Sequence, residues 1–218
     1  MTDTSRVALV TGAGSGVGKA AALALLRAGI DVEVYEQSSE LREVGAGIQI
    51  SPNGNRILDH LGVLQNLQAL SSPTDGKEIR LWNTGQMWKL FDLGDAAIQK
   101  YGYPYMTAFR PALLQVLADG VRALKPDAIQ LNARCLGYSQ TSEQVTLSFE
   151  NRPSVTGDLL IGADGVHSKI RTAMLGAEPT LFTGMVAWRA LIPMAALPAH
   201  MVRNVATNWV GPGGHVVH

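Results

Sequence analysis

Four glycines and one acidic residue near the N-terminus have the types and spacing that suggest chemistry. They are Gly12, Gly14, Gly16, Gly18 and Glu36. Glycine lets a backbone turn tightly and approach a pyrophosphate, and a following helix offers that anion free N–H groups and the positive end of its dipole. An acid about 20 residues beyond such a turn accepts hydrogen bonds from a ribose diol. Together these residues predict a dinucleotide-binding site.

The elements that must position these residues form one strand–turn–helix–strand unit. The apolar run 6–10 has the length of a buried parallel strand, and 19–28 is rich in alanine and leucine, which favour a helix. Gly29 ends that helix, and 31–36 reads as a second strand with the acid at its tip. A glycine-rich turn in an ordinary α/β domain is the alternative, and the complete order of elements disfavours it.

Three other positions could contact the same ligand. Asp164 follows an apolar strand, and parallel α/β sheets bind ligands at such carboxyl ends, while Ser168 could cap the next helix. Arg110 lies at the entry of a helix that runs to about position 124, where its guanidinium could reach a phosphate or form a structural ion pair. Arg42 is either a solvated loop residue or a cofactor contact.

The remaining elements change character along the chain. Alternating residues predict a β-hairpin over 79–91, which departs from the parallel α/β pattern. A helix is predicted over 55–61, with Ser51 as its N-cap. A β-meander is predicted over 128–131, 135–140 and 145–150, and further strands over 184–192, 205–210 and 214–218. The chain therefore combines a nucleotide-binding α/β part with a β-rich part.

Composition limits the function classes. The chain has 218 residues, of which 46% are hydrophobic and 17% charged, and its formal net charge is +0, so electrostatics gives no case for a nucleic-acid or anionic-membrane partner. Cys135 is the single cysteine, so no intrachain disulfide can form. The N-terminus lacks a signal pattern and no apolar run reaches membrane-spanning length. We expect a cytoplasmic protein without nucleic-acid or membrane partners.

From Gly29 to His218 the sequence resembles the class A flavoprotein aromatic hydroxylases, and most of all the salicylate hydroxylase and 3-hydroxybenzoate 6-hydroxylase group. The segments that carry the resemblance are 31–37 (DVEVYEQ), 41–53 (LREVGAGIQISPN), 109–110 (FR), 158–171 (DLLIGADGVHSKIR) and 209–218 (WVGPGGHVVH). The fourth contains the Asp-Gly motif that is highly specific to the family. The resemblance covers most of this chain but about half of a family member, and together with the apolar last strand it indicates a truncated chain.

The resemblance implies a cofactor role for eight residues, with FAD as the cofactor and NAD(P)H as the co-substrate. They are Gly12, Gly14, Gly18, Glu36, Arg42, Gly47, Arg110 and Asp164. The glycines and the glutamate would hold the ADP half of FAD. Arg42 and Gly47 would lie near the flavin, and Arg110 near the pyrophosphate. Asp164 would contact the diphosphate–ribose part and assist NAD(P)H. No metal is implied.

The resemblance also implies a reaction and one catalytic residue. The reaction is hydroxylation of a phenolic aromatic acid, such as a salicylate or a hydroxybenzoate, with NAD(P)H and O₂. His215 matches a histidine that helps to deprotonate the phenol of this small aromatic substrate. A phenolate ring reacts faster with electrophilic oxygen, and histidine is a suitable base because it titrates near neutrality. From the local sequence alone, His215 reads as a surface histidine.

The fold that the resemblance implies is α/β. A Rossmann-like FAD-binding domain, similar to p-hydroxybenzoate hydroxylase, would accompany an antiparallel β-sheet substrate layer that is C-terminally incomplete. The FAD-binding domain is predicted over 1–76 and 105–178, and a partial substrate-binding β domain over 77–104 and 179–218.

The N-terminal part of the sequence also resembles a second family. Positions 7–29 resemble a short-chain dehydrogenase, whose TGxxxGxG signature is met in full. The flavoprotein pattern GxGxxG uses Gly12 and Gly14, then meets Val17, and reaches Gly18 with one inserted residue. However, the dehydrogenase chemistry needs a tyrosine with a lysine four residues later, and none of the 5 tyrosines has one. A third possibility is a non-catalytic nucleotide-binding fragment.

Overall fold

The computed structural model describes residues 6–14, 16–41 and 47–218. The chain forms two compact units, each made of two segments: Met1–Val44 with Pro111–Ala187, and Gly45–Arg110 with Trp188–His218. They are called the first and the second unit. The predicted domain division instead groups 45–76 and 105–110 with the N-terminal segment, and 179–187 with the β-rich part. The assignment of an FAD-binding and a substrate-binding domain stays a prediction.

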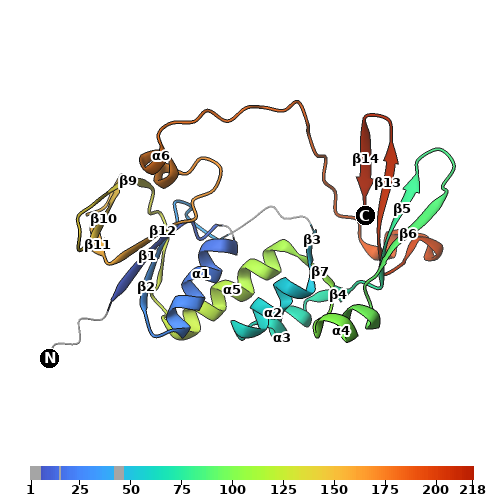
Figure 1. Ribbon diagram of the computed structural model, residues 1–218, viewed down its shortest axis with the longest axis horizontal. Coiled ribbons are helices and arrows are strands. Elements are labelled where there is room, and N and C mark those ends of the chain that lie inside the picture. Colours follow the sequence, from blue (N-terminus) through green and yellow to red (C-terminus); the bar gives the residue numbers. More distant parts are fainter. Residues whose placement is uncertain (1–5, 15, 42–46) are drawn as a thin grey trace. The chain divides into compact units, whose positions relative to one another are not determined.

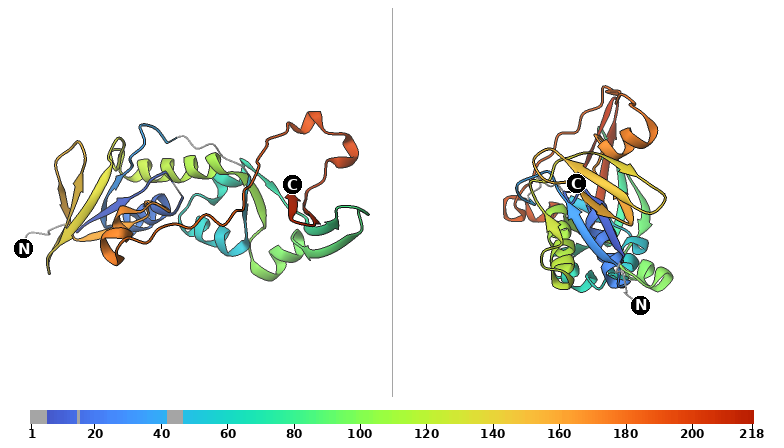
Figure 2. Two further views of the ribbon diagram at one scale, coloured as in Figure 1. Left: turned by 90° about the horizontal axis from the view of Figure 1, so that it is seen from above. Right: turned by 90° about the vertical axis from the view of Figure 1, so that its left-hand side faces the viewer.

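The first unit has three layers (Figures 1 and 2). Its parallel sheet has the order β12-β1-β2-β8, with β1 (Val7–Thr11), β2 (Asp31–Tyr35), β8 (Ile129–Gln130) and β12 (Leu159–Gly162). The helices α1 (Gly16–Arg27) and α5 (Arg110–Leu124) lie on one side of this sheet. The other side carries an antiparallel meander of β9 (Cys135–Gln140), β10 (Val145–Phe149) and β11 (Val155–Gly157), with α6 (Lys169–Leu175) against β9.

Strand β1 shows why this sheet is covered on both faces. Leu9 packs into a cluster with Leu147 and Phe149 of the meander. Its neighbours Ala8 and Val10 are also fully buried. Because successive side chains of a strand point to opposite faces, Ala8 and Val10 lie on the helix side. A strand with buried apolar residues on both faces is typical of a parallel sheet between two layers.

The second unit contains two sheets. The first is antiparallel, in the order β3-β7-β4, with β3 (Gly47–Ile50), β4 (Ser71–Pro73) and β7 (Met106–Phe109). The second has the order β14-β13-β5-β6, with β5 (Gly76–Leu81), β6 (Met87–Asp92), β13 (Val205–Gly211) and β14 (Gly214–Val217). The helical elements are α2 (Pro52–His60), α3 (Leu64–Gln68), α4 (Asp95–Tyr101), η1 (Met194–Ala196) and η2 (Ala199–Met201). The predicted antiparallel layer contains one parallel contact, between β5 and β13.

Two element predictions were wrong. Positions 128–131 do not join the meander, because β8 pairs parallel with β2, and the third meander strand is β11. Positions 184–192 form no strand, and Trp188 there is 96% exposed. An apolar run becomes a strand where a neighbouring strand takes up its backbone hydrogen bonds, and no described strand pairs with this one. Among the described ranges, no helix is both long and apolar enough to cross a bilayer.

Candidate functional site

The glycine turn between β1 and α1 has a geometry that three of its glycines require. Gly12 has a φ of 85°, and a Cβ there would lie 2.2 Å from the carbonyl oxygen of Ala163. A Cβ on Gly18 would lie 2.2 Å from the carbonyl oxygen of Gly12, and one on Gly14 would lie 3.1 Å from Glu36 Oε2. Gly12 therefore makes the turn, Gly18 allows α1 to pack closely, and Gly14 allows the close approach to Glu36. The spacing from Gly14 to Gly18 is one residue longer than in the flavoprotein pattern.

Glu36 is buried directly after β2 and holds the turn. Its Oε2 accepts a hydrogen bond from the Gly14 N–H at 2.5 Å. Its Oε1 accepts from the backbone N–H of Ser38 at 3.0 Å and from the Ser38 hydroxyl at 2.9 Å. At 4% exposure, the carboxylate has a fixed orientation at the carboxyl end of the sheet. Sequence reasoning identified the acid but missed Ser38, which could have been found as a hydroxyl two positions after it.

Asp164 lies just beyond β12 and caps α6. Its Oδ2 accepts from the backbone N–H of Lys169 at 2.7 Å and of Ile170 at 3.3 Å, and its Oδ1 accepts from the Ser168 hydroxyl at 2.5 Å. The Ser168 Oγ in turn accepts from the Arg171 N–H at 2.9 Å, so the predicted cap is present. The carboxylate thus satisfies N–H groups that a helix start leaves without partners.

One cavity joins these three features. It measures about 600 Å³, which lies in the range of small-molecule sites. Its lining comes from the glycine turn, the tip of β2, the start of β9 and the Asp-Gly loop after β12. The lining includes Gly12, Gly14, Glu36, Ser38, Arg134, Cys135, Asp164, His167 and Lys169. Burial raises the pKa of the Cys135 thiol, so this sulfur is a weak nucleophile at neutral pH.

The residues of this cavity fit a dinucleotide. Glycines at positions 12 and 14 line the cavity without side chains, which lets a phosphate approach the backbone closely. The buried carboxylate of Glu36 suits a ribose diol. Arg134, His167 and Lys169 supply basic groups for a diphosphate. No group of three or more His, Cys, Asp or Glu side chains in the described part of the chain could hold a metal ion.

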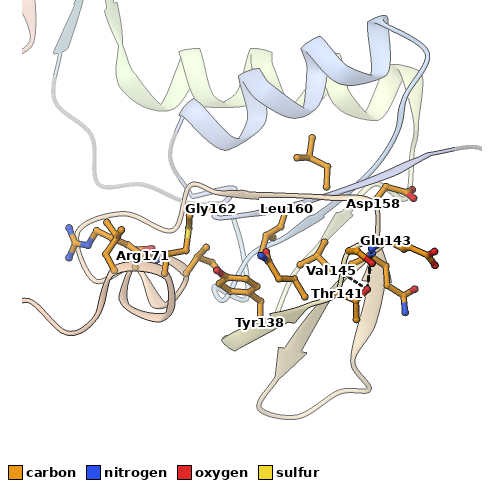
Figure 3. Close-up of a pocket in the computed structure, with 16 residues that line it drawn as sticks. Tyr138, Thr141, Glu143, Val145, Asp158, Leu160, Gly162 and Arg171 are labelled. Atoms are coloured by element: carbon orange, nitrogen blue, oxygen red, sulfur yellow. Dashed lines mark hydrogen bonds between the residues drawn. The ribbon is translucent and has the colours of Figure 1, made fainter.

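A second cavity of about 400 Å³ lies beside β12 in the same unit (Figure 3). Tyr138, Val145, Leu160 and Ile170 give it an apolar floor, and Asp158 and Arg171 lie in its lining. It contains neither the glycine turn nor Glu36. Its chemistry does not match a diphosphate, so the first cavity is the better candidate for a nucleotide site.

Five predicted site residues do not line the 600 Å³ cavity. One of them is Gly18, which lies in α1 close to the carbonyl oxygen of Gly12. Gly47, Arg110 and His215 belong to the second unit: Gly47 begins β3, Arg110 begins α5, and His215 is exposed on β14 opposite Val210. Arg42 lies outside the described residues. The roles predicted for these five residues, and for the predicted residues that do line the cavity, stay predictions.

Comparison with known proteins decides between the two families suggested by the glycine turn. Residues 4–207 match the profile of the FAD binding domain family. The chain belongs to this family. The dehydrogenase-like spacing of its turn is therefore a variation inside an FAD-binding fold, which agrees with the geometry of Gly12, Gly14 and Gly18.

Relatives of the family confirm the resemblance to aromatic hydroxylases. A 3-amino-4-hydroxybenzoate 2-monooxygenase of Streptomyces platensis is 35% identical over 97% of this chain and 52% of its own length. A 3-hydroxybenzoate 6-hydroxylase of Polaromonas naphthalenivorans is 35% identical over 96% of this chain and 52% of its own. Klebsiella pneumoniae HpxO, solved with FAD and uric acid, shares 28% identity with a TM-score of 0.77, over 97% of this chain and 52% of its own. This chain spans about half the length of these relatives.

Proposed function

We propose that this chain binds FAD in the 600 Å³ cavity and forms part of a monooxygenase that hydroxylates a phenolic aromatic acid. The observation that carries the proposal is the convergence of Gly12, Gly14, Glu36 and Asp164 on one cavity in a member of an FAD-binding family. The reaction consumes NAD(P)H, a proton and O₂. One oxygen atom replaces a ring hydrogen as a hydroxyl, and the other leaves as water.

The protein residues have separate tasks in this proposal. Glu36 accepts the ribose hydroxyls and the glycine turn receives the diphosphate, as acids and helix starts do in this type of fold. Asp164 faces the cavity and holds α6, so it would contact the ribose–diphosphate region from a fixed position. FAD, when bound and reduced by NAD(P)H, supplies the activation of oxygen.

His215 is the base in this proposal. Removing the phenolic proton raises the electron density of the ring, which favours attack by an electrophilic oxygen. We expect His215→Gln to slow hydroxylation about 100-fold or more, in the range of a lost general base, while reduction of the flavin by NAD(P)H changes little. Stopped-flow absorbance separates the two steps. Equal slowing of both steps, or of neither, would contradict the base role.

The direct test is FAD uptake by the 218-residue chain. The purified protein is mixed with FAD and passed over a desalting column, and the visible spectrum of the protein fraction is recorded. We expect a flavin spectrum for the wild type and its loss in Glu36→Leu, with Glu143→Leu, on the meander, as the matched control. A wild-type fraction without flavin absorbance would refute FAD binding by this chain. Retained flavin without NAD(P)H oxidation would favour a non-catalytic nucleotide-binding protein.

The short-chain dehydrogenase alternative predicts a different result. In that case NAD(P)⁺ alone would raise the melting temperature of the chain and FAD would not. The absence of a tyrosine–lysine pair at the required spacing disfavours this outcome.

A further inference from the structure

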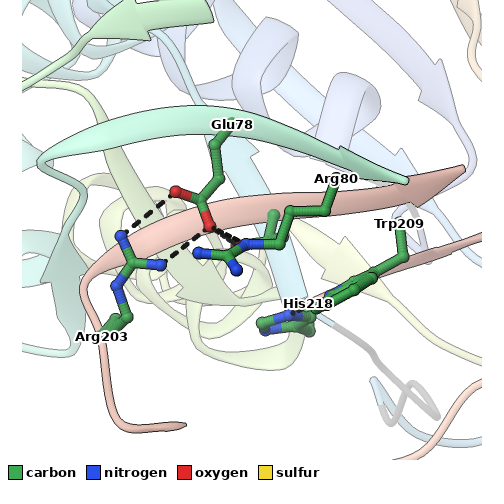
Figure 4. A network of polar contacts seen from close by, with 6 residues as sticks. Glu78, Arg80, Arg203, Trp209 and His218 are labelled. Carbon is green, nitrogen blue, oxygen red and sulfur yellow. Dashed lines mark hydrogen bonds and ion pairs between the residues drawn. The ribbon is translucent and has the colours of Figure 1, made fainter. Parts of the chain in front are cut away.

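The ribbon formed by β13 and β14 carries polar groups on one face. Thr207 and His218 exchange both backbone hydrogen bonds, at 2.8 and 3.0 Å, and so form a hydrogen-bonded pair. On their face the Thr207 hydroxyl donates to Glu78, and Trp209 Nε1 donates to His218 Nε2 at 3.1 Å. Figure 4 shows Glu78, Trp209 and His218 on this face together with Arg80.

His215 lies on the opposite face together with Asn208. The register pairs Val210 with His215 and Asn208 with Val217. Because pairs alternate along an antiparallel ladder, these two are non-hydrogen-bonded pairs, the type with the shorter distance between side chains. Asn208 and His215 are therefore diagonal neighbours, and such Cβ atoms lie about 7–8 Å apart or less, within reach of an amide and an imidazole.

The twist of the ribbon favours this diagonal. A right-handed twist shortens one diagonal on each face, and the two shortened diagonals run in opposite directions along the strand. On the Thr207 face the shortened diagonal joins Trp209 to His218, where the hydrogen bond is observed. On the other face the corresponding diagonal joins Asn208 to His215.

Asn208 has an unused acceptor. Its side-chain Oδ1 is buried and has no hydrogen-bond partner among the described residues. A buried acceptor without a donor is costly, so a neighbouring N–H would be bound readily. Most other side chains on this face are apolar, with Ile79 beside Asn208 on β5. Among β5, β6, β13 and β14, the charged side chain on this face is that of Lys77, which lies on β5 beside Ala206 of β13.

We propose that Asn208 is a positioning residue for His215. Its amide oxygen, which accepts no hydrogen bond from the residues that the structure describes, accepts one ring N–H once the imidazole turns toward it, and this leaves the other ring nitrogen unprotonated and free to take a proton. A neutral imidazole has one N–H and one lone pair, and the partner of the N–H decides the tautomer. A neutral amide can fix the tautomer without adding a charge beside the base. The inference rests on the base role of His215 in the proposed function.

The test measures the tautomer and needs neither FAD nor turnover. The two ring ¹⁵N chemical shifts of His215 are recorded by long-range ¹H–¹⁵N NMR in the labelled 218-residue chain, and His215→Gln assigns them among the 5 histidines. The variants are Asn208→Leu and Asn208→Asp, with Val217→Ala as the matched control on the same face. At a pH where the ring is neutral, we expect widely separated shifts in the wild type and in Val217→Ala.

Asn208→Leu should shift the tautomer ratio by about fivefold, as for the loss of one ordinary hydrogen bond. Asn208→Asp should keep the wild-type tautomer because its carboxylate accepts the same N–H. Asn208→Ala replaces the leucine variant if that one does not fold. Equal tautomer populations in the wild type would overturn the inference. So would an unchanged ratio in Asn208→Leu, or in Asn208→Ala where that variant takes its place. Failure of FAD uptake would refute the proposed function and leave this result intact.

Discussion

Glu78 offers the sharpest test of how the second unit is held together. This buried residue of β5 accepts hydrogen bonds from Arg80 Nε at 2.8 Å, from the two terminal nitrogens of Arg203 at 2.9 and 3.1 Å, and from the Thr207 hydroxyl at 3.0 Å (Figure 4). Arg203 lies two residues before β13 and Thr207 lies in β13, so the carboxylate of Glu78 connects two strands that are remote in sequence. Glu78→Gln keeps the size of the side chain and removes its charge.

The magnitude follows from burial and exposure. Removing one partner of a buried ion pair costs about 3–5 kcal/mol. The side chains of Arg80 and Arg203 are 26% and 43% exposed, so they can rehydrate when the charge is lost. We therefore expect Glu78→Gln to lower the free energy of unfolding of the second unit by about 2 kcal/mol at pH 7.

The same contacts predict a pH dependence. Burial alone would raise the pKa of Glu78, but hydrogen bonds from Arg80, Arg203 and Thr207 outweigh it and lower the pKa from 4.5 to about 2. Because the folded pKa lies below the unfolded one, the stabilisation is fully present above about pH 5 and is lost as the pH falls toward 2. At pH 3 the advantage of the wild type over Glu78→Gln should have shrunk by about 2 kcal/mol, so little of it should be left.

Urea unfolding followed by tryptophan fluorescence and circular dichroism measures both effects, with a separate transition fitted for each unit. Asp92→Asn is the matched control in the same sheet, because the Lys89–Asp92 pair is 60% and 59% exposed and should contribute less than about 1 kcal/mol. An unchanged urea midpoint for Glu78→Gln at pH 7 would refute the reasoning. So would an equal loss of stability on acidification in both proteins.

Three further predictions concern the first unit. Gly18→Ala places a Cβ 2.2 Å from a carbonyl oxygen. It should abolish FAD uptake and lower the free energy of unfolding in urea by about 3 kcal/mol or more. Gly137→Ala, whose Cβ would have no atom within 4 Å, should lower it by under about 1 kcal/mol. Equal effects of the two changes would contradict the packing role. Asp164→Asn should weaken the cap of α6 by about 1 kcal/mol, and amide hydrogen exchange should become faster in α6 than in the rest of the first unit. An equal increase of the exchange rate throughout the unit would argue against the capping role. Burial raises the pKa of the Cys135 thiol, so its alkylation by iodoacetamide at pH 8 should be slower in the folded chain than in urea. FAD should slow the reaction of the folded chain further, because the thiol lines the cavity. Equal alkylation rates in all three conditions would refute this.

The first strand–turn–helix–strand unit could be predicted from the sequence because its signals are local. Strand length, glycines, helix formers and the acid all lie within 6–36, and β1, α1 and β2 fall there. Gly18 was predicted as a cofactor-binding residue, but its packing role could not be predicted. A Cβ on Gly18 would lie 2.2 Å from the carbonyl oxygen of Gly12, and that close approach depends on how α1 packs on β1.

The predictions that failed depended on partners far along the chain. The two residues of β8 join the parallel sheet through Val34 and Tyr35, and nothing in their own sequence selects that sheet over the meander. The run 184–192 is apolar enough for a strand but has no described partner. Glu78 and Asn208 carried no sequence signal, because their surroundings arise from the pairing of β5 with β13 and of β13 with β14.

The hydrogen bond between Gly14 and Glu36 has a consequence for protein engineering. Replacing the acid after the second strand is an obvious route to altering the preference of such a site for one nucleotide over another. Here the same carboxylate accepts the N–H of Gly14, so the replacement would also loosen the glycine turn. A change at Glu36 would therefore alter both the cofactor preference and the rigidity of the turn. A redesign would need a compensating change at Gly14 or Ser38.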